Sequence, residues 1–187
     1  MVIYIALVHV AAIVGLFTIP KCHPYTLALA FILWPISGLG ITAGAHRLWS
    51  HRSYKATFGV KLFLMLANSI ANQGSIYHWA RDHRVHHKHS ESVSDPHNAL
   101  RGFFYAHVGW LLVHKDKNVA KAGKQLNFDD LRDDELIQWQ RRADPWFALF
   151  MCFVVPSVLC TLWGDNFWNG YWVAGALRYV FVLHVTW

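Results

Sequence analysis

The sequence predicts an all-α, polytopic membrane protein, with four transmembrane helices and a cytosolic helical cap that carries groups of closely spaced histidines. Of its 187 residues, 55% are hydrophobic and only 15% are charged, and the mean hydropathy is +0.23. Apolar residues gather into long stretches, while most polar residues fall in one central region. Ten tryptophans suit side chains at a lipid–water boundary. This balance excludes an intrinsically disordered chain and argues against an ordinary soluble domain.

The first two predicted spans are residues 1–19 and 25–43, separated by the short break Pro20-Lys21-Cys22-His23-Pro24. Each has about the length that crosses the hydrocarbon core at about 1.5 Å per residue. The opening stretch lacks the basic start and the small-residue cleavage site of a signal peptide, and another apolar stretch follows it at once. We therefore expect it to be a retained helix.

The third and fourth predicted spans are residues 146–164, interrupted by Pro156, and residues 170–187. Between the second and third spans, residues 44–145 hold 15 of the 17 Lys and Arg, 10 of the 11 Asp and Glu, and 10 of the 13 His. This region is the predicted cap. Because connections rich in Lys and Arg stay on the cytoplasmic side, we expect the cap to face the cytosol. The whole chain, residues 1–187, then forms a single domain.

Two apolar segments inside the cap region are too short to be clear spans. Phe58–Ala71 and Phe103–Val113 are predicted to be helices that lie along the membrane face or are buried under the cap. The polar stretch from Lys115 to Asp144 is predicted to form solvated helical faces.

Two groups of histidines are candidates for metal ligation. His46 and His51 lie in HRLWSH, directly after the second apolar stretch, and His83, His86 and His87 lie in DHRVHH. On an α-helix five residues rotate by about 500°, so the first pair would point about 140° apart and serve two metal ions or flank one cavity. The second group is spaced i, i+3, i+4 and shares one helix face. Three imidazoles on one stripe form a natural ligand set for iron, zinc or copper.

Imidazole ligands usually need an acceptor for their second ring nitrogen, and Asp82, Glu91 and Asp95 are nearby candidates. Protons compete with metal for imidazole, so we expect metal to be lost below about pH 6.

The three cysteines are too scattered for a disulfide framework, and there is no GxGxxG nucleotide-binding motif. Electrons for any redox reaction must therefore come from another protein.

HRLWSH and WARDHRVHH, within GITAGAHRLWSHRSYKA and before DPHNALRGFFYAHVGWLL, closely resemble the membrane acyl-CoA desaturases of the stearoyl-CoA type. The resemblance is strongest from Gly38 to Trp187. It implies four transmembrane helices, a cytosolic cap, two Fe²⁺ ions held almost wholly by histidine, and a place in the endoplasmic reticulum membrane. The implied reaction inserts a cis double bond, at carbon 9, into a saturated fatty acyl-CoA. The family uses dioxygen and electrons from cytochrome b5.

Carried over by position, the resemblance makes iron ligands of the five histidines in the two groups: His46, His51, His83, His86 and His87. The family's third group, HxxHH, and a further ligand shortly after the VTW segment have no counterpart in these 187 residues. We therefore expect the sequence to be a fragment. No catalytic side chain is expected beyond the metal ligands.

The substrate's head group is highly anionic, so its binding surface should be basic. The cap offers Arg81, Arg84, Lys88, Arg101 and Lys115. Of these, Arg81 and Lys115, together with Asp82, resemble family positions that contact the CoA portion. Trp187 resembles another substrate contact. Two departures are His114, where the family often has Arg, and Gly74, where an Asn often contacts substrate.

Trp79 and Thr186 resemble residues that line the bend of the family's acyl tunnel. Trp34 falls at the level of the tunnel's closed end, where the family often has Tyr. The larger indole would shorten the tunnel and favour acyl chains shorter than stearoyl. The alternative is that Trp34 is only a packing or lipid-facing aromatic residue.

Three alternative functions stay open. The first is a desaturase that acts at another carbon, and the second is a histidine-box lipid hydroxylase, since the same oxidant can hydroxylate or dehydrogenate. The third is a truncated, catalytically inactive membrane protein that binds metal. In each case the expected surroundings are a lipid membrane, and no nucleic-acid partner is expected.

Overall fold

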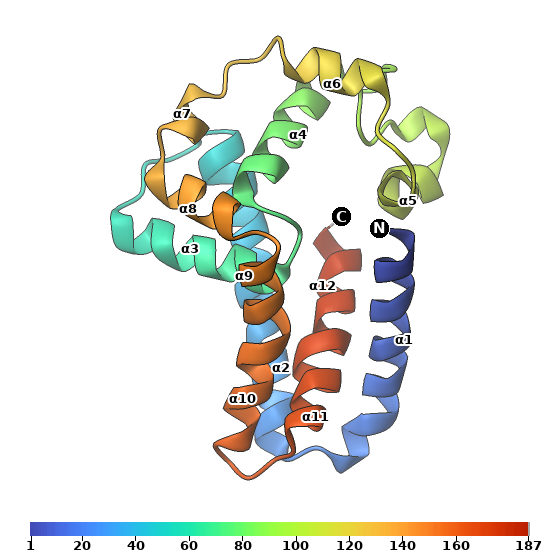
Figure 1. Cartoon of the computed structure of the whole chain (residues 1–187), viewed down its shortest axis with the longest axis vertical. Helices are drawn as coiled ribbons and strands as arrows, with labels where there is room; N and C mark the ends of the chain where they lie inside the picture. The colour runs from blue at the N-terminus through green and yellow to red at the C-terminus, as the bar shows by residue number, and fades with distance from the viewer. Residues whose placement is uncertain (187) are drawn as a thin grey trace.

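The computed structural model describes residues 1–186, and in these residues every regular element is a helix (Figure 1). The predicted all-helical class is therefore confirmed. In chain order the elements are α1 (Val2–Thr18), η1 (Ile19–Lys21), α2 (Pro24–Leu39), η2 (Gly40–Ser50), α3 (Phe58–Ala71), α4 (Ile76–His89), η3 (Ala99–Arg101), η4 (Tyr105–Gly109), α5 (Trp110–Leu112), α6 (Lys117–Gly123), α7 (Asp129–Arg132), α8 (Glu135–Ala143), α9 (Trp146–Leu149), η5 (Phe150–Val154), α10 (Val155–Thr161), α11 (Phe167–Asn169), η6 (Gly170–Leu177) and α12 (Arg178–Thr186).

Consecutive elements join into long rods that stand side by side: α1 with η1, α2 with η2, α9 with η5 and α10, and α11 with η6 and α12 (Figure 1). The two rods Val2–Lys21 and Pro24–Ser50 are long and apolar enough to cross a membrane. A bent pair, Glu135–Ala143 with Trp146–Thr161, is a third candidate, with an angle of 80° at the break. The remaining helices form a cap over one end of the rods (Figure 1).

The second rod contains the predicted span 25–43 and extends beyond it. Its helix does not end at residue 43 but continues through η2 to Ser50, because GITAGAHRLWS contains no proline to interrupt it. One helical rod therefore carries the chain from the far end of the bundle into the cap. The predicted helix Phe58–Ala71 is α3, with the same bounds. The second predicted cap helix, Phe103–Val113, corresponds to η4 and α5.

Helix α1 is apolar all round, yet only one stripe of it is buried. Ile5, Val8, Ala12 and Gly15 recur at helical spacing and pack against the rod that contains η6. Its other faces leave large apolar side chains exposed: Ile3, Leu7, Val10, Ile13, Leu16 and Phe17. A continuous exposed apolar surface of this kind is suited to lipid rather than to water.

A buried guanidinium joins the rods near their middle. Arg178 is only 3% exposed, and it donates hydrogen bonds to the Ser37 hydroxyl of α2, the Ile70 carbonyl of α3, and the carbonyl and Sγ of Cys152 in η5. No carboxylate pairs with it in residues 1–186. Carbonyl, hydroxyl and thiol groups from three other elements therefore take the place of water around this charge.

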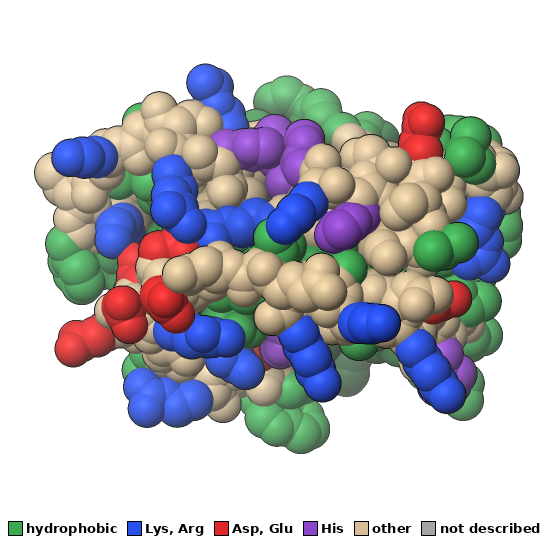
Figure 2. Space-filling view, turned by 90° about the horizontal axis from the view of Figure 1, so that it is seen from above, with side chains coloured by type: hydrophobic (Ala, Val, Ile, Leu, Met, Phe, Trp, Pro, Cys, Tyr) green, Lys and Arg blue, Asp and Glu red, His purple; other side chains and the backbone are tan. Residues whose placement is uncertain are grey.

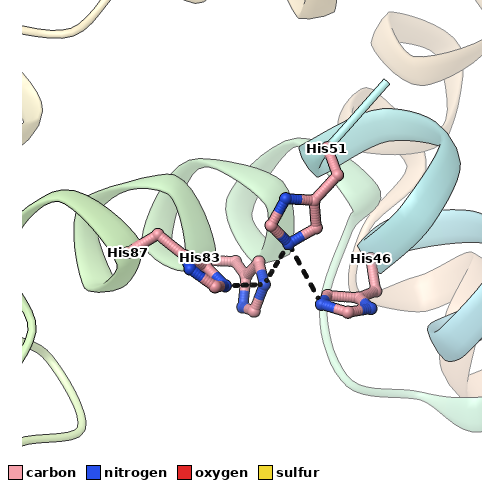
Figure 3. A group of neighbouring side chains, drawn as sticks. All are labelled: His46, His51, His83 and His87. Carbon is pink, nitrogen blue, oxygen red and sulfur yellow. Dashed lines mark hydrogen bonds between the residues drawn. The ribbon is translucent and has the colours of Figure 1, made fainter. Parts of the chain in front are cut away.

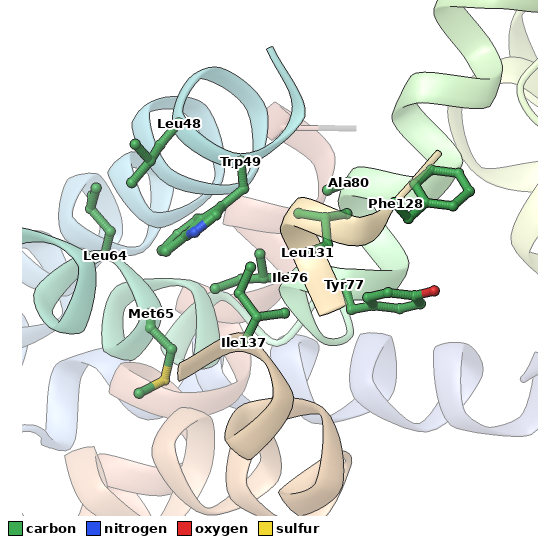
Figure 4. Close-up of a cluster of buried hydrophobic side chains, with 10 residues drawn as sticks. All are labelled: Leu48, Trp49, Leu64, Met65, Ile76, Tyr77, Ala80, Phe128, Leu131 and Ile137. Carbon is green, nitrogen blue, oxygen red and sulfur yellow. The ribbon is translucent and has the colours of Figure 1, made fainter. Parts of the chain in front are cut away.

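A second hydrophobic core lies inside the cap and fixes the elements that carry the candidate metal ligands (Figure 4). It joins η2, α3, α4, α7 and α8 through Leu48, Trp49, Leu64, Met65, Ile76, Tyr77, Ala80, Phe128, Leu131 and Ile137. Leu131 and Ile137 are completely buried, although they belong to the polar stretch after Lys115. That stretch is therefore more than a solvated face, because its apolar side chains complete this core.

The crossing of the second rod over α3 requires a glycine. A Cβ atom on Gly40 would overlap backbone atoms of Ala67 and Asn68, whereas a Cβ on Gly38 would meet nothing within 4 Å. We expect Gly40→Ala to lower the free energy of unfolding by about 1–3 kcal/mol, since neither backbone can yield cheaply. Thermal unfolding in detergent would measure this.

Gly38→Ala is the matched control in the same helix. It should leave stability unchanged or raise it by up to about 1 kcal/mol, because alanine favours a helix. Equal melting temperatures for the two variants would contradict the proposed close approach.

Candidate metal site and adjoining cavity

Four histidines from two distant parts of the chain meet under the cap (Figure 3). His46 lies in η2 and His51 at its end, while His83 and His87 lie one turn apart on α4. The Nε2 atom of His51 is 3.1 Å from that of His46 and 3.1 Å from that of His83, and His83 Nε2 is 3.0 Å from His87 Nε2. One ring nitrogen from each residue falls within 4.8 Å of the others.

The winding of η2 explains why His46 and His51 converge. Gly40–Ser50 is a π-helix, with a hydrogen bond from the His51 N–H to the His46 carbonyl and one from the Ser50 hydroxyl to the Ala45 carbonyl. In a helix with i→i+5 bonds, residues five apart return close to the same face. The α-helical expectation of about 140° between the two rings is therefore wrong. The two rings instead approach each other, with their Nε2 atoms 3.1 Å apart.

The donor set fits a transition-metal ion. A metal–imidazole bond of about 2.0–2.1 Å places two nitrogens of one ion about 3 Å apart, which is close to the separations found here. Within residues 1–186, these Nε2 atoms have only one another as hydrogen-bond partners. Neutral nitrogen donors suit iron, zinc, copper or nickel rather than magnesium or calcium.

His86 is separate from the group of four. Its Nδ1 lies 2.8 Å from Oδ1 of the buried Asp95, and its ring centre is 6.1 Å from that of His83. Asp95 is therefore the acceptor among the three predicted carboxylates. A proton on Nδ1 leaves the lone pair of His86 on Nε2, which is the arrangement of many metal-ligating histidines.

Burial keeps the central imidazole of the group neutral. Burial, together with the neighbouring rings of His46, His87 and His51, lowers the pKa of His83 to about 3. Burial also lowers the pKa of His87. At neutral pH both rings are then in the uncharged form that binds metal.

Arg84 connects the two elements that carry the group. From α4 it donates to the carbonyls of Trp49 and Ser50 at the end of η2, at 2.6 and 3.1 Å. Both ends of its guanidinium also bind the Asp130 carboxylate, at 2.9 and 2.6 Å. Only 13% of the Arg84 side chain is exposed. The sequence suggested Arg84 for the anionic head group, but its donors are used to hold η2 against α4.

A cavity of about 400 Å³ adjoins the group of four histidines. His46, His83 and His86 form one part of its wall, together with Trp79, whose ring stacks on His83 at 4.8 Å. Gln73 and Thr186 form another part, joined by a 2.5 Å hydrogen bond from Gln73 Nε2 to Thr186 Oγ1. The complete lining is Ile41, Thr42, His46, Gln73, His78, Trp79, Asp82, His83, His86, His97, Ala106, Trp110 and Thr186.

A second, more basic cavity of about 320 Å³ lies beside the first, and Asp82 lines both. Its lining includes Arg81, Lys115, Lys124 and Arg132. Asp82 pairs with Arg81 at 2.8 Å and with Lys115. Seen from above, the cap has histidine side chains near the centre of its face with Lys and Arg side chains nearby (Figure 2).

The other predicted substrate residues lie apart from these cavities. Trp34 packs against Ile41, Ala71 and Val182, one layer beyond the first cavity, and its ring meets Phe181 at 5.1 Å. His114 is exposed and is absent from both linings. Trp187 lies outside the described residues.

Seven residues of the cavity lining were not predicted from the sequence: Ile41, Thr42, Gln73, His78, His97, Ala106 and Trp110. His97 lies in DPHN, where the backbone N–H of His97 donates to the Asp95 carboxylate in a turn and the Asn98 side chain caps η3. The Nδ1 atom of His97 is buried without a hydrogen-bond partner, and its ring meets that of Trp110 at 4.2 Å. Nothing in the spacing of Gln73 or Trp110 distinguishes them from ordinary loop and core residues.

Known proteins match the chain over all of its 187 residues. They include "Stearoyl-CoA desaturase 5" of Bos taurus at 49% identity, "Acyl-CoA desaturase 1" of Tachysurus fulvidraco at 51% and "Stearoyl-CoA desaturase" of Sus scrofa at 48%. The chain covers 56%, 56% and 52% of these proteins, respectively, and so spans about half the length of the curated relatives it matches. No family model matches the chain.

The half-buried histidines His83 and His97 should make stability depend on pH. Burial lowers the pKa of His97 to about 4, as it lowers that of His83 to about 3. Unfolded histidine takes up a proton near pH 6.5, so below that pH the unfolded state binds more protons than the folded state. The metal-free chain should be insensitive to pH above about 6.5 and should lose stability as the pH falls from there towards 4.

The measurement is thermal unfolding in detergent with a chelator, between pH 7 and pH 4.5. His97→Asn should flatten the slope by at most about 1.4 kcal/mol per pH unit, the limit for one histidine. The carboxyl group of Asp95 affects stability only at a lower pH than the histidines do. Burial raises its pKa, but the hydrogen bonds from His86 and the His97 and Glu91 N–H groups outweigh burial and lower it. An unchanged slope in His97→Asn would contradict the assignment.

Proposed function

Because the chain is homologous over its whole length to stearoyl-CoA and acyl-CoA desaturases, we propose that it belongs to an enzyme that desaturates a fatty acyl-CoA. The proposed reaction inserts a cis double bond, at carbon 9, with dioxygen as the oxidant. The observation that carries this proposal is the group of four histidines, since two of its members, His46 and His83, line a cavity next to the apolar rods.

The proposed cofactor is a pair of iron ions. His46, His51, His83 and His87 would hold iron on one side, and His86, oriented by Asp95, would contribute from the adjacent wall. Bound iron would supply, with dioxygen, the oxidising power to remove hydrogen from an unactivated methylene pair. The chain's own residues decide which carbon atoms lie near the ligands, so the shape of the cavity sets the bond position.

The two adjoining cavities suggest how the substrate lies. The phosphates of the CoA portion would occupy the basic cavity with Arg81 and Lys115, and the acyl chain would run through the first cavity past Trp79 and Thr186. Asp82, which lines both, would stand where the two portions meet. The bond between Gln73 and Thr186 fixes another part of the cavity wall and would hold the bend of the acyl chain.

The proposed setting is the endoplasmic reticulum membrane, crossed by all four rods, with the histidines on the cytosolic side. The exposed apolar face of α1 supports contact with lipid. The Lys and Arg side chains on the cap support a cytosolic position and a negatively charged electron donor, for which we propose cytochrome b5.

Expression of the full-length gene product in yeast that lacks its own desaturase would test the function. Gas chromatography with mass spectrometry should detect a new cis-monounsaturated fatty acid, and its fragmentation gives the bond position. His86→Ala should abolish the product, whereas His23→Asn, at the opposite end of the rods and able to keep the helix cap that His23 provides, should retain it. A hydroxylated product would assign the enzyme as a hydroxylase, and no product from well-expressed, iron-loaded protein would contradict an enzymatic function.

Trp34 offers a test of chain-length selection. If its indole closes the tunnel, Trp34→Ala should raise the ratio of C18 to C16 monounsaturated product several-fold, because the lengthened cavity accepts the longer chain. Phe31→Ala is the control, since Phe31 lies on the same helix but is 69% exposed. A ratio that stays the same in both variants would leave Trp34 as a packing residue.

A further inference from the structure

A buried amide joins three of the helices that surround the candidate metal ligands. Gln140 belongs to α8 and is 3% exposed. Its Oε1 atom accepts a hydrogen bond from the backbone N–H of Ile76, the first residue of α4, at 2.9 Å. Its Nε2 atom donates to Asn68 Oδ1 and to Ser69 Oγ of α3, at 2.9 Å each. All three bonds are buried, so water does not compete for them.

We propose that Gln140 is a positioning residue for the group of four histidines, which presupposes the proposed function because it takes that group to be a metal site. Gln140 lines neither cavity and is not a member of the group. It acts through α4, by fixing where the helix that carries His83 and His87 begins.

The Gln140 amide can lie in one orientation only. The Ile76 N–H is a donor, so the atom that faces it must be Oε1, and both hydrogens of Nε2 then have acceptors in α3. An apolar side chain of the same size would fill this space at a lower cost in desolvation. A polar contact that is fully satisfied inside a core instead specifies one arrangement of the elements that it joins.

The contact lies at the one part of α4 that cannot satisfy itself. The first N–H groups of an α-helix have no partner within the helix, so a buried one needs an acceptor from another element. Ile76 is completely buried and belongs to the core of Figure 4. Because Gln140 supplies the acceptor, it sets the depth at which α4 starts in this core.

The direction of α4 needs a second fixed point besides Arg84, which ties the middle of the helix to the end of η2. Ile76 lies eight residues before Arg84, about 12 Å along the axis, and His87 lies three residues after it, about 4.5 Å along. A shift of about 1 Å at Ile76 would therefore move the backbone at His87 by about 0.4 Å the other way. That is about twice the 0.2 Å to which metal–ligand distances are held.

The other ligand-bearing helix is referred to the same amide. Asn68, which accepts from Gln140, lies where α3 meets the second rod, and a Cβ on Gly40 would overlap the Asn68 backbone. Gly40 is the first residue of η2, which contains His46 and ends next to His51. One buried side chain therefore holds α4 directly and holds η2 through the α3 segment on which it packs.

Cobalt binding by the full-length gene product tests the proposal without an activity measurement, because the visible absorption of Co²⁺ reports the ligands and geometry of its site. Gln140→Met keeps the size of the side chain and removes all three hydrogen bonds. It should weaken Co²⁺ binding at least about 10-fold and change the absorption bands, as the loss of a residue that orients ligands does. Gln140→Glu keeps an oxygen for the Ile76 N–H, and burial favours the protonated carboxyl group, so this variant should retain the spectrum of the parent.

Ser69→Ala is the matched control. It removes one of the same three hydrogen bonds, while Asn68 still holds the Gln140 amide in place. The melting temperature should fall slightly, and the affinity for Co²⁺ should stay within about two-fold of the parent, because the acceptor for Ile76 is unchanged.

Two outcomes overturn the proposal: the affinity and spectrum of the parent in Gln140→Met, or an equal loss in Ser69→Ala, which would mark a general loosening of the core. If Gln140→Met elutes as an aggregate, Gln140→Asn takes its place. Its amide is one methylene shorter and cannot reach Ile76, so it must show the weakened binding. A parent that binds no Co²⁺ would contradict the metal site itself, whereas a parent that binds Co²⁺ as tightly as Gln140→Met contradicts only the role of Gln140.

Discussion

Arg84 maintains the arrangement on which the candidate site depends. Four imidazoles can share one space only if the end of η2 stays against α4, and these elements are joined by a loop, by α3 and by a turn. Arg84 lies beside His83 and binds the last carbonyls of η2, where a helix dipole favours positive charge. Its paired contacts with Asp130 fix the plane of the guanidinium. Burial raises the pKa of Asp130, but the guanidinium groups of Arg84 and Arg52 outweigh burial and lower it, so the carboxylate stays charged.

Close packing and buried polar contacts also hold the helices together deeper in the bundle. Among membrane helices, burial of apolar surface contributes little to association, so close packing and polar contacts become important. Gly40 allows the second rod to touch the backbone of α3, and Arg178 then joins α2, α3 and η5 a short distance away. At the far end Asp165 accepts hydrogen bonds from the His23 N–H and the Thr26 hydroxyl. Polar or close contacts therefore join these elements both near the middle of the bundle and at its far end.

Much of the fold and part of the candidate site could be predicted from the sequence, because hydropathy and histidine spacing are local signals. The apolar stretches predicted the rods, and the i, i+3, i+4 spacing placed His83 and His87 on one face of α4. The orientation of His46 relative to His51 could not be predicted in this way, because a π-helix has no clear mark in composition. The separation of His86 from its neighbours depends on Asp95, which lies beyond the end of α4. Contacts between distant segments, such as Gln73 with Thr186, are likewise absent from any local pattern.

The π-helical form of Gly40–Ser50 also limits how this segment can change during evolution. A π-helix has one more residue within each hydrogen-bonded turn than an α-helix, so loss of a single residue would let the segment relax into the commoner form. That relaxation would turn His46 away from His51 and shift every buried side chain of η2 in the core of Figure 4. Substitutions that preserve size can accumulate here, whereas insertions and deletions cannot. Apart from His46 itself, constant length between Gly40 and His51 is therefore a more sensitive indicator of an intact site than the identity of the intervening residues.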